Sequence, residues 1–295
     1  MEWILFILGG ASIGVISGFF GIGGGIVLTP ALLILGYEPS QAIMLSLMLT
    51  LGSTITGSLS HFRLNNVNVK LAMILGGFGV IGSVVTAPFV KWLDSLNGAA
   101  TVISVAYIAI LSWFSYQFFS KRDNDSKAKG KGAVPVIGFF TGVISSLMGV
   151  SGGFVMTPLL TKWIKLDLNK AIGTSISAAS IIVISGIGSY MFTGETLDFR
   201  HGIVLIIGAL LGTPLGSVQL KRFKVAKVKQ MLSYMYMIVA VSVLFKMLSL
   251  SAVSFGLILL SVIVFFGILI HSVQQAKRDS FIPCSRPSVR RRWSR

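Results

Sequence analysis

Two glycine clusters are the residues of this sequence best suited to chemistry. Residues 21–25 read Gly-Ile-Gly-Gly-Gly, and residues 149–153 read Gly-Val-Ser-Gly-Gly. Glycine adopts backbone conformations that are closed to other residues, and it weakens a helix, so each cluster predicts a break between two helices. The N–H groups at the start of the following helix lie at the positive end of its dipole and can bind an anion. We call residues 21–25 the first hinge and residues 149–153 the second hinge. If the two meet, they would hold a small oxyanion from both sides.

Hydroxyl side chains flank both hinges. Some follow the hinges directly, and others open the next helix, where they could line the same cavity. The alternative for such a hydroxyl is a hydrogen bond back to a carbonyl of its own helix. The three histidines are too few for a metal cluster, and the sequence predicts no catalytic residue, metal or cofactor. The predicted substrate-binding residues are Gly21, Gly23, Gly24, Gly25, Thr29, Ser46, Gly149, Ser151, Gly152, Gly153, Thr157, Thr174 and Ser175.

The composition places these hinges in a membrane protein. Hydrophobic residues make up 54% of the 295 residues and charged residues only 12%, whereas soluble domains carry about 25% charged residues. So few charges cannot cover the surface of a water-soluble globule of this size. The composition excludes a soluble enzyme, a disordered chain and a collagen-like fibre.

Apolar spans of membrane-crossing length follow one another along the chain. Most are close to the roughly 20 residues that a bilayer crossing needs. The first and the fifth are too long for one upright helix, and each contains a hinge. All nine acidic residues fall between the spans or at the chain ends. The spans are residues 3–36, 40–62, 69–90, 98–119, 134–164, 171–193, 202–220, 231–245 and 251–270.

The sequence is internally repeated. Gly-Val-Ile-Ser at residues 14–17 recurs at 142–145, and Thr-Pro at 29–30 recurs at 157–158. Further downstream, Ala-Ile at 42–43 recurs at 171–172. A fixed period of this kind indicates a duplicated structural unit.

The distribution of basic residues suggests that the two copies are inverted. Residues 121–131, 221–229 and 277–295 hold 17 of the 25 Lys and Arg residues, and the positive-inside rule places such stretches in the cytoplasm, beside anionic headgroups. Counting crossings then puts residues 63–70 inside and their equivalents, residues 195–200, outside. This holds if residues 134–164 cross an even number of times, as a hairpin or two half-length helices would. Inverted repeats with broken helices are typical of secondary transporters.

Two other motifs predict different chemistry and are disfavoured. The first hinge faintly matches a dinucleotide-binding fingerprint, but Ile26 occupies its sixth position and no βαβ unit surrounds it. Residues 149–152 match the Gly-x-Ser-Gly of rhomboid-type intramembrane serine proteases, which would need an intramembrane histidine as base. The three histidines lie near span ends, and the repeat counterpart of Ser151 is Gly23. The position is therefore interpreted as a hinge.

Several segments together resemble a known family. Residues 19–30, their second copy, and Ala-Ile-Gly-Thr-Ser at 171–175 are similar to the sulfite exporter TauE/SafE family of membrane transporters, as are residues 61–63, 66–68 and 76–82. The likeness runs from residue 14 to residue 245. It implies a multi-pass protein of the bacterial cytoplasmic (inner) membrane that moves sulfur-containing oxyanions, organosulfonates or carboxylates. The first copy reads Ala-Ile-Met-Leu-Ser at 42–46, so it departs from the Gly-Thr-Ser of the second.

The sequence therefore predicts an all-α polytopic membrane protein with two inverted repeats of five helical segments and an extra C-terminal helix. We expect a secondary exporter of small anions that works by alternating access around the hinges, with its C-terminus in the cytoplasm. An anion channel and a non-transporting membrane scaffold or sensor remain the alternatives. Its expected partners are the anion and a lipid bilayer with anionic headgroups, not nucleic acid, and a homo-oligomer is left open. The expected units are residues 1–120 (first repeat), 121–132 (basic linker), 133–249 (second repeat), 250–272 (extra helix) and 273–295 (basic tail).

Overall fold

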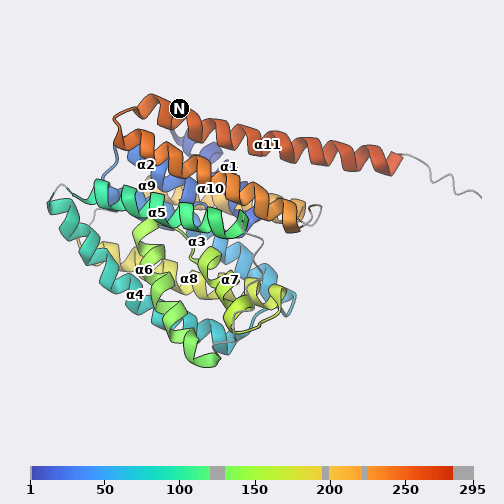
Figure 1. The fold of residues 1–295 in the computed structure, drawn as a ribbon, viewed down its shortest axis with the longest axis horizontal. Helices are drawn as coiled ribbons and strands as arrows, with labels where there is room; N and C mark the ends of the chain where they lie inside the picture. Colours follow the sequence, from blue (N-terminus) through green and yellow to red (C-terminus); the bar gives the residue numbers. More distant parts are fainter. Residues whose placement is uncertain are drawn as a thin grey trace, which may run out of the picture.

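The computed structural model describes residues 2–96, 98–119, 130–194, 199–220, 223 and 225–281. Within these ranges every long element is an α-helix, as the apolar spans predicted (Figure 1). Most of the predicted basic linker and tail, and the acidic residues at 195 and 198, lie outside the described ranges. The helices are α1 (Glu2–Phe20), α2 (Gly25–Ile34), α3 (Pro39–Arg63), α4 (Val69–Ser95), α5 (Ala99–Phe119), α6 (Val134–Met148), α7 (Gly153–Trp163), α8 (Leu168–Phe192), α9 (Phe199–Leu220), α10 (Val225–Met247) and α11 (Ser251–Phe281).

Both overlong spans are broken at their glycines, which confirms that prediction. The first hinge separates α1 from α2, and the second separates α6 from α7. Gly149 ends α6 with a φ of 69°, and Gly152 precedes α7 with a φ of 68°. Side chains rarely tolerate this left-handed region, so glycine is the residue that the turn requires.

Seven of the described helices are long and apolar enough to cross a membrane, namely α3, α4, α5, α8, α9, α10 and α11. Their outer faces are also apolar. Phe78 and Val85 of α4, Leu215 of α9 and Ile263 of α11 are all exposed. A water-soluble protein would not leave so many large apolar side chains uncovered. The chain is therefore a multi-pass membrane protein.

Glycines bring α1 and α9 into close contact and fix their relative direction. A Cβ on Gly10 would lie 3.2 Å from the Leu205 carbonyl oxygen, and one on Gly14 would lie 2.9 Å from the Ala209 Cα. Because both contacts advance along both helices together, α1 and α9 run parallel. Small residues spaced four apart permit this approach of two backbones in a membrane.

The first hinge is the tip of a helical hairpin. A Cβ on Gly202 of α9 would overlap the Met48 side chain of α3, and one on Gly52 would lie 2.8 Å from the Ile206 carbonyl oxygen. These contacts make α3 parallel to α9 and hence to α1. Since α2 connects two helices that run in the same direction, it must return along the molecule from the hinge.

The second hinge is the tip of another hairpin. The contacts of α4 with α6 pair Phe78 with Gly138, and Gly82 with Val143, so these two helices are parallel. Helix α8 is also parallel to α4, because Asn68 N–H donates to Thr174 Oγ1 at 3.0 Å while Ser83 and Ser185 share a hydrogen bond at 2.9 Å. Helix α7 therefore returns along the molecule, as α2 does.

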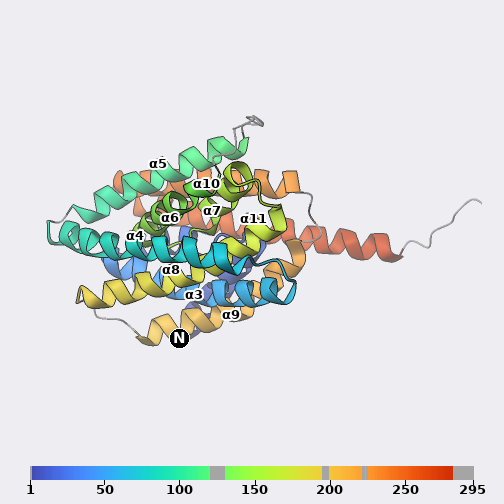
Figure 2. The ribbon, with the colours of Figure 1, turned by 90° about the horizontal axis from the view of Figure 1, so that it is seen from below.

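The two halves of the chain contact each other in exchanged pairs. Helix α1 packs on α9, and its counterpart α6 packs on α4, the counterpart of α9. The counterparts α3 and α8 cross between the halves in opposite directions, since Ser58 bonds Ser177 while Leu47 lies against Gly186. Figure 2 shows α3, α4 and α8 lying along the long axis of the molecule.

Helix α11 is an addition to this paired arrangement. It packs against α10, where Ser242 and Ser254 exchange hydrogen bonds of 2.7–2.9 Å with each other's carbonyl groups. Its Phe265 ring meets the Phe19 and Phe20 rings of α1. The helix then runs past the end of the bundle (Figures 1 and 2). It extends eleven residues beyond the predicted apolar span, to Phe281, because that extension contains Gln-Gln-Ala-Lys-Arg at 274–278, a run of good helix formers.

Candidate functional site

The two hinges touch each other in the interior of the molecule. A Cβ on Gly25 would overlap the carbonyl oxygen of Gly149, and one on Gly23 would lie 2.8 Å from the Ser151 Cβ. A Cβ on Gly153 would lie 3.3 Å from the Gly21 carbonyl oxygen. Residues 22–25 and 149–153 are all buried. The hairpin tips from the two halves therefore form one contact, made largely of main-chain atoms.

Hydroxyl groups cover the carbonyl end of α6 at this contact. Thr29 Oγ1 donates to the Met148 carbonyl at 2.9 Å, and the Tyr107 hydroxyl donates to the same oxygen. Thr50 Oγ1 donates to the Gly149 carbonyl at 3.3 Å. The last carbonyl groups of a helix have no partner within it, so these three side chains satisfy acceptors that would otherwise be buried without a donor. Thr29 is a predicted site residue, and its hydroxyl hydrogen is already used in the bond to the Met148 carbonyl.

Three main-chain N–H groups at the start of α2 have no such partner among the described residues. In the described part of the chain, nothing accepts a hydrogen bond from the N–H groups of Gly24, Gly25 or Ile26, and all three residues are buried. These groups begin α2, where the helix dipole is positive. Buried N–H groups without an acceptor are rare in proteins and call for a water molecule or a ligand.

One of the N–H groups at the start of α7 bonds the side chain of Ser151, which lies just before the helix. Gly153 N–H donates to Ser151 Oγ at 3.3 Å, whereas within the described ranges the N–H groups of Gly152 and Phe154 find no acceptor. Because the Ser151 hydroxyl serves as a cap for the helix, the hinge interpretation of this residue explains its position without a nucleophilic role.

Ser46 is an unpaired hydroxyl at the same place. Its side chain is 0% exposed, and its Oγ has no hydrogen-bond partner in the described structure. The Ser46 Cβ would lie 2.8 Å from a Cβ on Gly149. An unsatisfied buried hydroxyl costs about 1–3 kcal/mol. Ser46 and the start of α2 therefore supply polar donors that are unused in the protein itself.

The other predicted hydroxyls lie farther from the contact between the hinges. Thr157 and Ser175 bond each other at 2.7 Å, and the Ser175 Oγ would lie 4.0 Å from a Cβ on Gly153. Thr174 is not brought to the hinges: its hydroxyl accepts from the N–H of Asn68, in the connection between α3 and α4. Neighbouring positions on a helix point in different directions, so Thr174 and Ser175 cannot share one role.

Two residues at the contact were missed by the sequence analysis. Thr50 and Tyr107 both bond hinge carbonyls, from α3 and α5. A signal for Tyr107 was present, since Tyr236 follows it by the same 129 residues that separate Ala42 from Ala171. Thr50 has no hydroxyl counterpart, so the repeat gave no signal for it.

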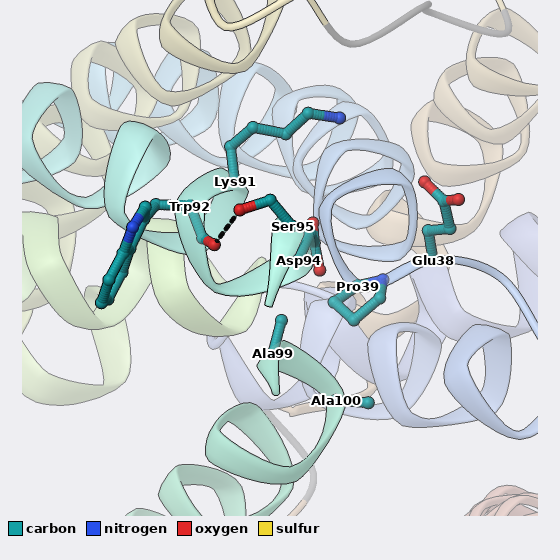
Figure 3. Close-up of a pocket in the computed structure, with 8 residues that line it drawn as sticks. All are labelled: Glu38, Pro39, Lys91, Trp92, Asp94, Ser95, Ala99 and Ala100. Carbon is teal, nitrogen blue, oxygen red and sulfur yellow. Dashed lines mark hydrogen bonds between the residues drawn. The ribbon is translucent and has the colours of Figure 1, made fainter. Parts of the chain in front are cut away.

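A separate cavity lies at the other end of α2 from the first hinge. It has a volume of about 650 Å³ and is lined by the start of α3, the end of α4 and the start of α5 (Figure 3). Glu38, Asp94 and Lys91 contribute two carboxylates and one ammonium group. This balance of charge does not favour an anion, so the contact between the hinges remains the candidate site. No group of His, Cys, Asp or Glu residues within the described ranges could hold a metal ion.

Comparison with known proteins gives one consistent result. A family model described as sulfite exporter TauE/SafE matches residues 6–243. The probable membrane transporter protein YdhB of Bacillus subtilis is 26% identical over 210 residues, which is 70% of this chain and 85% of YdhB. A probable membrane transporter protein of Methanocaldococcus jannaschii is 27% identical over 213 residues, 68% of this chain and 76% of that protein.

A further relative, a probable membrane transporter protein of Haemophilus influenzae, is 28% identical over 200 residues, 65% of this chain and 74% of its own length. No solved structure matches the chain. The family match covers both hinges and all the helices that position them. The chain therefore belongs to the sulfite exporter TauE/SafE family of membrane transporters.

Proposed function

We propose that the protein is a secondary transporter that exports small anions by alternating access around the two hinges. The substrates would be sulfite, organosulfonates or related sulfur-containing or carboxylate anions. The observation that carries the proposal is the row of buried N–H groups at residues 24–26, which lack an acceptor in the described part of the chain. Gly25 and Ser46, whose hydroxyl is unpaired there, both lie against Gly149 of the second hinge. Main-chain N–H groups at a helix start are a recurrent anion-binding arrangement. The family description and the names of the relatives support transport.

The directions of the helices support inverted repeats. Helices α1 and α3 run parallel to each other, and their counterparts α6 and α8 run parallel to each other, but α3 and α8 are antiparallel. Each hairpin would then enter the membrane from its own side and end near the middle. This is the arrangement that places a substrate between two half-length helices in transporters.

The distribution of charge supports an orientation with the C-terminus in the cytoplasm. Helices α5, α9 and α11 precede the three basic stretches, and all run toward the same end of the molecule, on the right in Figure 2. The positive-inside rule assigns that end to the cytoplasm. The cavity beside Glu38 would then open on the outer side.

Flux measurements with reconstituted protein test the function. Liposomes loaded with labelled sulfite, methanesulfonate or acetate should release at least one of these anions only when the protein is present, and the rate should saturate with substrate. Flux that rises linearly with concentration would indicate a channel instead. Absence of flux for all three anions under an imposed membrane potential would favour a scaffold or sensor and overturn the proposal.

Substituting Ser46 by alanine should weaken substrate binding at this site. The loss of one donor to an anion is expected to raise KM about three- to tenfold with little change in maximal rate. The matched control is Ser60→Ala on the same helix, because the Ser60 hydroxyl is exposed and bonds the Thr56 carbonyl of its own helix. Equal KM values for the Ser46→Ala variant and the unmodified protein would remove Ser46 from the site.

A further inference from the structure

Three hydroxyls from the first half of the chain hold the end of α6. They come from Thr29 of α2, Thr50 of α3 and Tyr107 of α5, and we call them the hydroxyl clasp. The Tyr107 side chain is 0% exposed. Its hydroxyl donates to the Met148 carbonyl and also lies 3.4 Å from the Gly25 carbonyl. Tyr107 therefore touches the end of α6 and the start of α2, one group on each hairpin.

The clasp is not repeated on the first hinge. Thr157, the counterpart of Thr29, bonds Ser175 instead of a hinge carbonyl. Residue 179, the counterpart of Thr50, is an alanine. The ring of Tyr236, the counterpart of Tyr107, packs against Phe154 with centroids 6.2 Å apart. The two halves thus share a fold but differ in how each hairpin tip is held.

Both hinges are closely packed where they meet. In the first hinge only Gly21 is open, since a Cβ there would meet no atom within 4 Å, whereas a Cβ on Gly23, Gly24 or Gly25 would lie within 2.8 Å of another atom. In the second hinge Gly149 lies against Thr29 and Ser46. Any motion that separates the two hairpin tips must break the Thr29–Met148 bond, which joins α2 to α6, and one of the two bonds of Tyr107.

We infer that Tyr107 is a positioning residue that keeps the two hinges closed over the candidate anion site, and that the hydroxyl clasp opens when the hairpins separate during transport. The inference rests on the proposed transport function for its role in the cycle. The bonds themselves, and their effect on access to the hinges, can be tested without any substrate.

The test compares two buried tyrosines. Tyr107→Phe removes the hydroxyl that joins the hairpins, and Tyr190→Phe removes a hydroxyl that donates to the Ser146 carbonyl of α6 at 2.7 Å. Both donate to α6, but only Tyr107 also reaches the first hinge. Each variant is made in a background with Cys284→Ser and Ser151→Cys, so that the only thiol lies in the second hinge. The probe is methyl methanethiosulfonate, and the readout is the rate of thiol labelling in detergent.

The thiol should label slowly in the background protein, because Ser151 is 1% exposed. Tyr107→Phe should raise the labelling rate about five- to tenfold, the effect of one lost hydrogen bond on an opening equilibrium. Tyr190→Phe should leave it unchanged. An unchanged rate in Tyr107→Phe, or an equal rise in both variants, would overturn the inference, because the clasp would then not control access.

Flux measurements separate this inference from the proposed function. With Ser151 and Cys284 restored, Tyr107→Phe should raise KM for the transported anion several-fold while Tyr190→Phe does not, since only the former loosens the contact beside the N–H groups of α2. Faster labelling without flux of any anion in the unmodified protein would support the clasp and overturn transport. Flux with an unchanged KM in Tyr107→Phe would support transport and overturn the positioning role.

Discussion

Substituting Gly25 by valine is expected to abolish transport. Even the first atom of the new side chain, its Cβ, would overlap the Gly149 carbonyl oxygen, which is main chain and cannot turn aside. Moving that carbonyl would break its bond with Thr50 and separate the hairpin tips. Because over-packing at a main-chain contact costs about 1–3 kcal/mol, the protein should still insert, but the hinges could no longer meet. Flux into proteoliposomes is the measurement.

The control for this substitution is Gly188→Val on α8, since a Cβ on Gly188 would meet no atom within 4 Å. It should insert and transport normally. A monodisperse elution profile in detergent shows whether each variant is folded. Gly152→Val should behave like Gly25→Val, because its φ is 68° and its Cβ would overlap the Thr141 methyl group. Normal flux in folded Gly25→Val protein would show that the close contact of the hinges is not needed.

Cysteines placed in two equivalent connections should react from opposite sides of the membrane. Glu38 lies between α2 and α3, and Lys165 lies between α7 and α8. The helix directions put these connections at opposite ends of the molecule, because α3 and α8 begin at opposite ends. In a background without Cys284, an impermeant maleimide added to intact cells should label Glu38→Cys fully and Lys165→Cys only after permeabilisation.

This result would be all or none, since a hydrophilic connection lies on one side or the other. The reverse pattern would keep the inversion but exchange inside and outside. Labelling of both cysteines from the same side would contradict inverted repeats, and with them the meeting of two hairpins that enter from opposite sides.

Hydropathy and glycine content predict most of this fold from the sequence. Each apolar span became a helix or a helical hairpin, because a membrane leaves the backbone few alternatives to internal hydrogen bonds. The hinges were predictable because Gly21, Gly23, Gly149 and Gly152 adopt positive φ values that other residues avoid. The start of α10 differs from the prediction: the helix begins at Val225 and not at residue 231. Lys227 and Lys229 interrupt the apolar span, but lysine is a good helix former, so the helix includes them.

The hydrogen bonds of the site were harder to predict. The sequence shows that Thr29 and Thr174 are hydroxyls near glycines, but their partners, Met148 and Asn68, are more than a hundred residues away. Which partner a hydroxyl finds depends on the register of two helices, and periodicity along one chain does not contain that information. The repeat marks Tyr107 through its counterpart Tyr236, but it does not show what the hydroxyl bonds, since a tyrosine in an apolar span is equally suited to packing against lipid.

The comparison of the two halves also shows what duplication predicts. It predicted the two hinges, whereas the paired packing of α1 with α9 and of α6 with α4 emerged from the structure. It did not predict that the clasp is present on one hinge only. Thr157, the counterpart of Thr29, is also a threonine but bonds Ser175, and the counterpart of Thr50 is an alanine. Divergence of the copies at a few polar positions is therefore where their functions would differ.

The central claim is that a small anion binds between the two hinges, and selenite offers the most direct test because its selenium atom can be located by anomalous scattering. Crystals of the protein with selenite should give an anomalous peak within hydrogen-bond distance of the N–H groups of Gly24, Gly25 and Ile26 and of the Ser46 hydroxyl, and the peak should be lost in Ser46→Ala crystals or weakened there. A peak only in the cavity beside Lys91, or none in the protein interior, would contradict the claim.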